Sequence, residues 1–226
     1  QKIELDSLMV ISYATDEMLE DVSALNSMLP DMMAEEIEFK LGDAIINGTG
    51  AGQPLGIANN GSLVTVNKEA GQAPATLAPE NIAKMWSRMW ARSRGNSVWL
   101  INQDCEPQLH TMTLDAGTAG FPVYLPPGGF SSSPYGMLYG RPVIPVEFAQ
   151  TLGTTGDIQL VDLSEYLLAR KGGVEQAVSM HVQFLYAEQV FRAKLRVGGQ
   201  PLWSSPLTPK NGTNTVSPFV WLQARS

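Results

Sequence analysis

The sequence predicts an α+β fold, in which helices and strands intermix without the regular strand–helix–strand rhythm of a parallel sheet. Three observations support this class. Apolar residues recur at spacings of three and four from Met18 to Ile45, residues 191–197 alternate with a period of two, and the 226 residues include 21 Gly and 15 Pro, which indicates many turns. At roughly 150 residues per domain, the length predicts one large domain or two interleaved domains.

The N-terminal part is expected to form a strand followed by two helices. Residues 2–12 partly alternate between apolar and polar side chains, as a strand does. Thr15 is a candidate helix N-cap, because two acidic residues follow it. Pro30 interrupts the apolar stripe, so we expect a short helix and then a new helix capped by Ser27, with Pro30 in its first turn. The second helix should end at Asn47, before a glycine.

The middle of the chain alternates between shorter elements. Pro79 and Glu80 open a helix predicted at 81–94 and ended by Gly95, and a Gly- and Pro-rich stretch at 114–139 is too long for an ordinary connection. Gly172-Gly173 is expected to form a turn. The other predicted elements are a buried strand at 97–101, a helix at 102–114, and strands at 143–146, 158–161, 174–197 and 219–222.

Composition excludes several classes of protein. Apolar residues make up 44% and charged residues 16%, so the chain is not disordered and much of its surface must be neutral. The net charge of −7 disfavours a general nucleic-acid binder. No apolar stretch is long enough for a membrane span, and the single cysteine favours a reducing compartment. Because the chain begins with Gln1 and not Met, we expect a processed or trimmed product.

No enzymatic site or cofactor is predicted. The two histidines and one cysteine do not form a zinc-binding pattern. Cys105 and His110 could form a nucleophilic pair, but on one helix their side chains would point about 140° apart. Gly48, Gly50 and Gly52 follow a helix, whereas a phosphate-binding loop follows a strand and opens a helix. We expect these glycines to end the helix and form a close turn.

Two charged clusters are candidate contacts between subunits. Glu35, Glu36 and Glu38 lie on the main predicted helix. Arg192, Lys194 and Arg196 share one face of the period-two strand and alternate with apolar residues. Each cluster can simply be solvated, as charge runs usually are. The alternative hypothesis is that the basic face of one copy contacts the acidic cluster of another copy.

Several segments together resemble the major capsid protein family of tailed bacteriophages, which has the Hong Kong 97-type fold. The strongest stretch runs from the TDEMLED segment at 15–21 through the long helix to AIINGTG at 44–50 and QPLGI at 53–57. GMLYGRPVIP at 136–145, GDIQLVDL at 156–163 and FLYAEQVFRA at 184–193 match further segments in order. The resemblance also includes residues 97–107 and spans nearly the whole chain.

The resemblance implies a peripheral domain built on a long spine helix, and an axial domain. Residues 14–53 and 166–199 would form the peripheral domain, residues 54–165 and 200–226 the axial domain, and residues 1–13 the base of an extended loop. Pro126, Gly128 and Gly129 would lie in a loop near the capsomer axis. Some members cross-link a lysine to an asparagine; Glu188 could match the acidic residue used there, but no asparagine is nearby, so cross-linking is not expected.

The implied function is that of a major capsid subunit of a tailed phage or prophage, which self-assembles into an icosahedral shell around DNA. The implied partners are copies of itself in pentamers and hexamers, portal and scaffold or protease proteins, and DNA bound without sequence specificity; no membrane is involved. Assembly would take place in the bacterial cytoplasm, whereas this trimmed chain would be a monomer or small oligomer. The alternatives are the shell protein of an encapsulin-like nanocompartment and an unrelated α+β enzyme.

Overall fold

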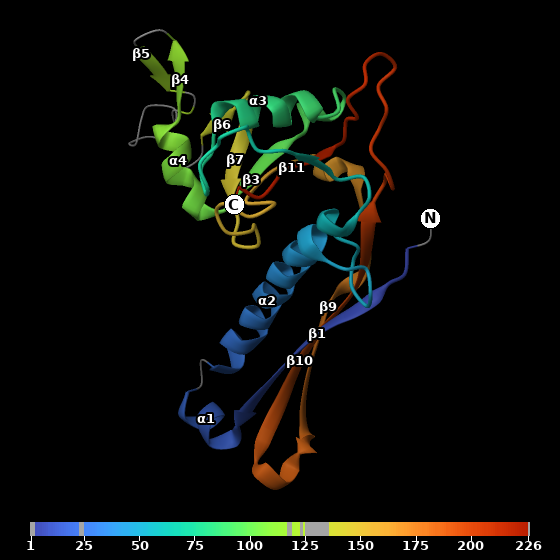
Figure 1. The fold of residues 1–226 in the computed structure, drawn as a ribbon. Helices are drawn as coiled ribbons and strands as arrows, with labels where there is room; N and C mark the ends of the chain where they lie inside the picture. The colour runs from blue at the N-terminus through green and yellow to red at the C-terminus, as the bar shows by residue number, and fades with distance from the viewer. Residues whose placement is uncertain (1–2, 23–24, 117–118, 123, 125–135, 226) are drawn as a thin grey trace. The chain divides into compact units, whose positions relative to one another are not determined.

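The computed structural model describes residues 3–22, 25–116, 119–122, 124 and 136–225 (Figure 1). The chain forms two compact units. The first contains Gln1–Asn59 and Leu167–Pro201, and the second contains Asn60–Tyr166 and Leu202–Ser226. Each unit combines helices with a sheet, so the α+β prediction is confirmed. Among the described residues, no helix has the length and apolar character needed to cross a membrane.

The first unit is built on a three-stranded sheet in the order β1-β10-β9. Strand β1 (Asp6–Thr15) runs antiparallel to the central strand β10 (Glu188–Pro201) over its whole length. Strand β9 (Tyr166–Gln183) forms the other edge and is joined to β10 by the short turn at Phe184–Tyr186. The single strand predicted at 174–197 is therefore wrong, because the chain reverses direction at this turn. β1 therefore begins and ends later than the strand predicted at 2–12, because its pairing with β10 continues up to the helix cap.

Helix α2 (Leu25–Asn47) covers one face of this sheet (Figure 1). Its buried residues Met33 and Ile37 belong to the same core as alternate residues of β10. The β10 members of that core are Phe191, Ala193, Leu195 and Val197, so the predicted period of two is confirmed. The long helix is thus stabilised by apolar burial along one side.

The apolar stripe forms two helices, as predicted, but the second helix begins earlier than predicted. The Thr15 hydroxyl accepts a hydrogen bond from the Met18 N–H at 3.3 Å, and so caps helix α1 (Asp16–Asp21) as expected. Helix α2 begins at Leu25, before Ser27, and Pro30 therefore lies inside it. Pro30 removes one internal hydrogen bond, but its carbonyl accepts a bond from Gln176 Nε2 of β9 at 3.1 Å. Packing on the sheet outweighs this loss.

The second unit contains a mixed six-stranded sheet in the order β2-β11-β8-β3-β7-β6. The two central strands, β8 and β3, are antiparallel, and β3 is parallel to β7. The predicted strands at 158–161 and 219–222 are confirmed. The strands predicted at 97–101 and 143–146 also form, with ends that differ from the prediction by at most two residues. The strands are β2 (Val64–Val66), β3 (Val98–Ile101), β6 (Met137–Leu138), β7 (Arg141–Pro145), β8 (Ile158–Val161) and β11 (Phe219–Leu222).

Helix α3 (Pro79–Arg88) packs on this sheet through Ile82 and Met85 but ends before the predicted Gly95. The helix ends early because the residues after it form hydrogen bonds with the segment around Ser217. The Trp90 N–H donates to the Ser217 carbonyl at 3.0 Å, and the Ser217 N–H donates to the Arg88 carbonyl at 3.1 Å. These tertiary hydrogen bonds replace the helical ones.

Three other predictions at the level of elements were wrong. The helix predicted at 102–114 is a 3₁₀ turn at Gln103–Cys105, the short helix α4 (Glu106–Thr111), and the beginning of strand β4 (Thr113–Ala116). Within the stretch predicted as loop, β4 pairs with β5 (Ala119–Pro122). Gly172-Gly173 is not a turn: Gly172 takes a φ of 76°, but β9 continues through it.

Candidate subunit interface

The outer face of the three-stranded sheet, away from α2, carries the predicted basic cluster. Each basic residue of β10 lies directly opposite a residue of β1: Arg192 faces Ile11, Lys194 faces Met9, and Arg196 faces Ser7. Arg192 and Arg196 are exposed and Lys194 is half-buried. Met9, Ile11 and Tyr13 are also exposed on this face. We call this surface of β1 and β10 the basic–apolar face.

The opposite side of the same unit is acidic. Glu35, Glu36 and Glu38 are all exposed on α2, while Met33 and Ile37 of the same turns are buried against the sheet. Glu36 pairs with Lys40 at 3.8 Å in an exposed contact, which contributes little to stability. Exposed apolar residues accompany the acids here too, namely Met28, Met32 and Phe39. We call this surface the acidic helix face.

The two charged clusters do not meet within one copy. The basic–apolar face and the acidic helix face lie on opposite sides of a two-layer unit, with the core containing Ile37 and Leu195 between them. Contact between them therefore requires a second copy of the chain. Both patches combine charged and apolar side chains. In a protein–protein interface, the apolar side chains are buried and the charged side chains fix the register of the two partners.

The predicted glycine loop ends helix α2 and connects it to strand β10 of the same unit. The Gly48 N–H donates to the Ala44 carbonyl, ending α2, and the Leu55 N–H donates to the Gly199 carbonyl of β10 at 2.8 Å. Gly50 and Gly52 have φ values of 78° and 69°. The loop therefore serves as a helix stop and a turn, as expected. The predicted axis-loop residues Pro126, Gly128 and Gly129 lie outside the described residues.

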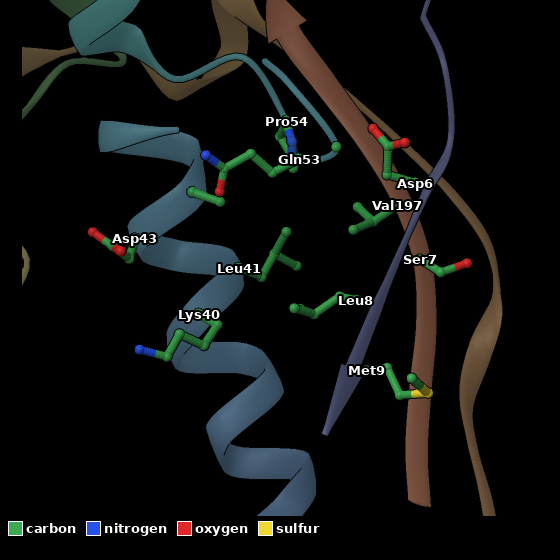
Figure 2. A pocket seen from close by; sticks show the side chains of 12 residues that line it. Asp6, Ser7, Leu8, Met9, Lys40, Leu41, Asp43, Gln53, Pro54 and Val197 are labelled. Carbon is green, nitrogen blue, oxygen red and sulfur yellow. The ribbon is translucent and has the colours of Figure 1, made fainter. Parts of the chain in front are cut away.

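A groove of about 430 Å³ lies beside this loop, between β1 and the C-terminal half of α2 (Figure 2). Leu8, Leu41 and Val197 line its apolar part. Its charged lining residues are Asp6, Lys40 and Asp43. The described part of the chain contains no cluster of ligands that could bind a metal ion.

The candidate nucleophile is not activated. Cys105 is fully buried, and burial, followed by the negative charge of Asp157, raises the pKa of its thiol to about 12. Its Sγ contacts the Asp157 carbonyl at 3.6 Å. His110 lies on α4 with its ring against Tyr124, at a centroid distance of 5.2 Å. A reactive cysteine has a lowered pKa and an accessible sulfur, so Cys105 fits a structural role.

Sequence reasoning missed two exposed apolar surfaces of the first unit. The turn between β9 and β10 presents Phe184, Leu185 and Tyr186 to solvent, and Leu185 is 93% exposed. Strand β1 is apolar on both faces, which is visible in the sequence as the unbroken run of apolar residues around Met9 and Ile11. A strand with two apolar faces signals either complete burial or an interface.

The chain is similar to known capsid proteins. The model of the Phage capsid family matches residues 1–211. Among solved structures, the capsid of the native GTA particle has a TM-score of 0.74 at 17% identity, over 99% of this chain and 74% of that one. Mycobacterium phage Bobi gives 0.66 at 13% identity, over 98% and 72%. The SrpI encapsulin from Synechococcus elongatus gives 0.58 at 13% identity, over 97% and 73%. No curated protein matches this sequence.

The fold is that of the solved capsid structures. The chain belongs to the phage capsid family, whose model covers nearly all of it. It has the Hong Kong 97-type fold and the function of a major capsid protein in a virion.

Proposed function

We propose that copies of this chain form the pentamers and hexamers of an icosahedral shell that encloses DNA. The family match over residues 1–211 carries this proposal. The first unit would serve as the peripheral domain with α2 as its spine, and the second unit as the axial domain. The role is geometric, with no catalytic step.

The contacts between copies would use the two charged faces of the first unit. Arg192, Lys194 and Arg196 of one copy would contact Glu35, Glu36 and Glu38 of another, and the nearby exposed methionines and aromatic residues would be buried with them. Apolar burial would supply most of the free energy of association, and the charge pairs would set the register.

The remaining partners follow from a phage shell. Portal and scaffold or protease proteins would act during assembly in the bacterial cytoplasm, and packaged DNA would be contacted without sequence specificity. Pro126, Gly128 and Gly129 would lie where subunits approach around the capsomer axis. A net charge of −7 fits weak contact with DNA, because repulsion of phosphates keeps the wall from binding it tightly.

The test is expression of the complete gene and imaging of the product by electron microscopy. We expect hollow icosahedral particles. A discrete soluble monomer would contradict the proposal. The likeness to the Synechococcus elongatus encapsulin, at a TM-score of 0.58, favours a second candidate, a shell around a protein cargo. Particles purified from the native host would distinguish the two, because a phage shell contains DNA and a nanocompartment contains an enzyme.

A further inference from the structure

Strand β9 leaves an unprotected edge on the three-stranded sheet. β9 is the last strand in the order β1-β10-β9, so one side of its backbone has no partner strand among the described residues. Natural edge strands usually carry lysines, prolines or bulges that prevent pairing with another chain. Between Val174 and Gln183, however, β9 has no lysine, arginine or proline, and its charged or titratable residues are only Glu175 and His181.

The side chains of this segment are also apolar and exposed. Val178, Met180 and Val182 are 56%, 55% and 67% exposed. They share a face with Gln176, which bonds to Pro30 of α2, and with Val174, which packs against the core of the first unit. Thus the apolar row begins under the helix and continues beyond the part of the sheet that the helix covers.

The backbone indicates which residues can accept a new strand. The Ala187 carbonyl accepts the Asp16 N–H at 2.9 Å, and the Glu165 carbonyl accepts the Leu202 N–H at 2.9 Å. The odd-numbered residues of β9 therefore direct their backbone groups toward β10. Backbone groups alternate sides along a strand. The N–H and C=O groups that point to the open edge are therefore those of Val174, Gln176, Val178, Met180 and Val182.

The segment is complementary to itself when a second copy runs antiparallel and the two strands cross at Val178. Val178 then lies opposite Val178, Ala177 opposite Ser179, Val174 opposite Val182, and Glu175 opposite His181. The edge-pointing residues 174, 176, 178, 180 and 182 pair only with one another, as an antiparallel ladder requires. The two charged or titratable side chains face each other twice, related by the two-fold axis.

We propose that two copies of this chain join edge to edge through residues 174–182 of β9, antiparallel across a two-fold axis at Val178. The two three-stranded sheets thereby become one six-stranded sheet. This contact is isologous, so it closes and does not propagate into fibres. Arg170 and Lys171, just before the segment, limit the pairing to these nine residues, because charges on an edge oppose further strand addition. The inference rests on the proposed assembly of many copies.

Cysteine cross-linking in the product of the complete gene tests the register. In Val178→Cys, the paired Cα atoms would be about 5.5 Å apart, within disulfide range. In Val174→Cys, the two equivalent positions would be about 27 Å apart, eight residues along the ladder. The native Cys105 is fully buried and does not interfere.

We expect Val178→Cys to form a disulfide-linked dimer under mild oxidation. Val174→Cys alone and Val182→Cys alone should not, whereas a mixture of these two variants should cross-link. In the Val178→Cys background, His181→Glu should slow cross-linking at least about tenfold by placing two carboxylates opposite each other, and Glu175→Lys should restore the rate.

Two results would overturn the inference. One is cross-linking of Val178→Cys no faster than that of Val174→Cys, and the other is a rate that does not respond to His181→Glu. If particles form while Val178→Cys stays unlinked within them, the β9 contact is wrong and the shell function stands. If no particles form from the complete gene, the shell function fails whatever the cross-linking shows.

Discussion

Arg225 and Asp157 form an ion pair in the second unit in which both side chains are completely buried. Arg225 donates from both terminal nitrogens to the Asp157 carboxylate. Asp157 also accepts the N–H groups of Gly153 and Ile158, each at 2.9 Å. The backbone of Arg225 is held as well, since its N–H donates to Gly153 and its carbonyl accepts from Ala75. This pair therefore anchors the C-terminal segment to the six-stranded sheet.

Removing one partner of this pair should strongly destabilise the second unit. We expect Arg225→Met to lower the free energy of unfolding by about 3–5 kcal/mol, because it leaves a buried carboxylate without its counter-charge. Urea unfolding of the variant measures this loss. Arg92→Met, at an exposed site, is the matched control and should change stability by less than about 1 kcal/mol. Equal losses in the two variants would show that the buried pair does not anchor the C-terminal segment.

Stability should fall at alkaline pH. Burial raises the pKa of the Cys105 thiol from 9.0 to about 12, and burial alone raises the pKa of Tyr166 from 10.0 to about 12. The folded state therefore holds these protons after the unfolded state has lost them. This stabilisation is complete below pH 9 and is lost as the pH rises from 9 towards 12.

Urea unfolding at pH 8, 9, 10 and 11 measures this dependence. We expect the free energy of unfolding to be highest at or below pH 9 and to decrease above it. Cys105→Val should remove most of the decrease between pH 9 and 10, because Tyr166 contributes mainly above its unfolded-state pKa of 10.0. A profile for this variant identical to that of the parent chain would contradict burial of the thiol as the cause.

Two glycines in one loop should differ sharply in their tolerance of alanine. A Cβ at Gly48 would collide with the carbonyl oxygens of Pro54 and Ala44, whereas a Cβ at Gly52 would meet nothing within 4 Å. Gly52→Ala should then cost only the strain of its φ of 69°, about 1 kcal/mol. Gly48→Ala should cost about 3 kcal/mol or more. Thermal unfolding of the two variants compares them directly, and similar costs would rule out close packing at Gly48.

Reversing charge on the basic–apolar face should weaken assembly. We expect Arg192→Glu with Arg196→Glu to raise the protein concentration needed for assembly at least about tenfold, which corresponds to about 1.4 kcal/mol. Adding Glu35→Lys and Glu36→Lys should restore assembly if the two faces meet. Light scattering against protein concentration gives the threshold.

The control for this prediction keeps the change in net charge and moves it elsewhere. Lys68→Glu with Lys210→Glu alters two exposed sites of the second unit by the same total charge. Its threshold should stay close to that of the parent chain. If Arg192→Glu with Arg196→Glu behaves like this control, the two residues are solvated and make no contact with another subunit.

Local patterns predicted those elements whose stability is local. The cap at Thr15, the end of α2 at Asn47 and the alternation along β10 all follow from side-chain chemistry within a few residues. The errors arose where distant segments decide. α3 ends at Arg88 because Ser217, more than a hundred residues later, takes its last hydrogen bonds, and β9 passes through Gly172-Gly173 within the sheet that β10 completes.

The surface was predictable only in part. The sequence places Arg192, Lys194 and Arg196 on one strand face, and the structure adds that Met9 and Ile11 share this face. That neighbourhood depends on the register between β1 and β10, which are separated by most of the chain. The exposure of the apolar row on β9 could not be predicted for a similar reason. It depends on the length and position of α2, which determine the part of the sheet that stays uncovered.

Cryo-electron microscopy of particles assembled from the complete gene tests most directly whether this chain is a shell subunit that works through its surfaces. We expect an icosahedral reconstruction in which neighbouring copies cover both the basic–apolar face at Arg192 and the acidic helix face at Glu35. Particles in which both faces stay open to solvent would contradict the proposed contacts, and a preparation that contains only monomers would contradict the shell-forming role itself.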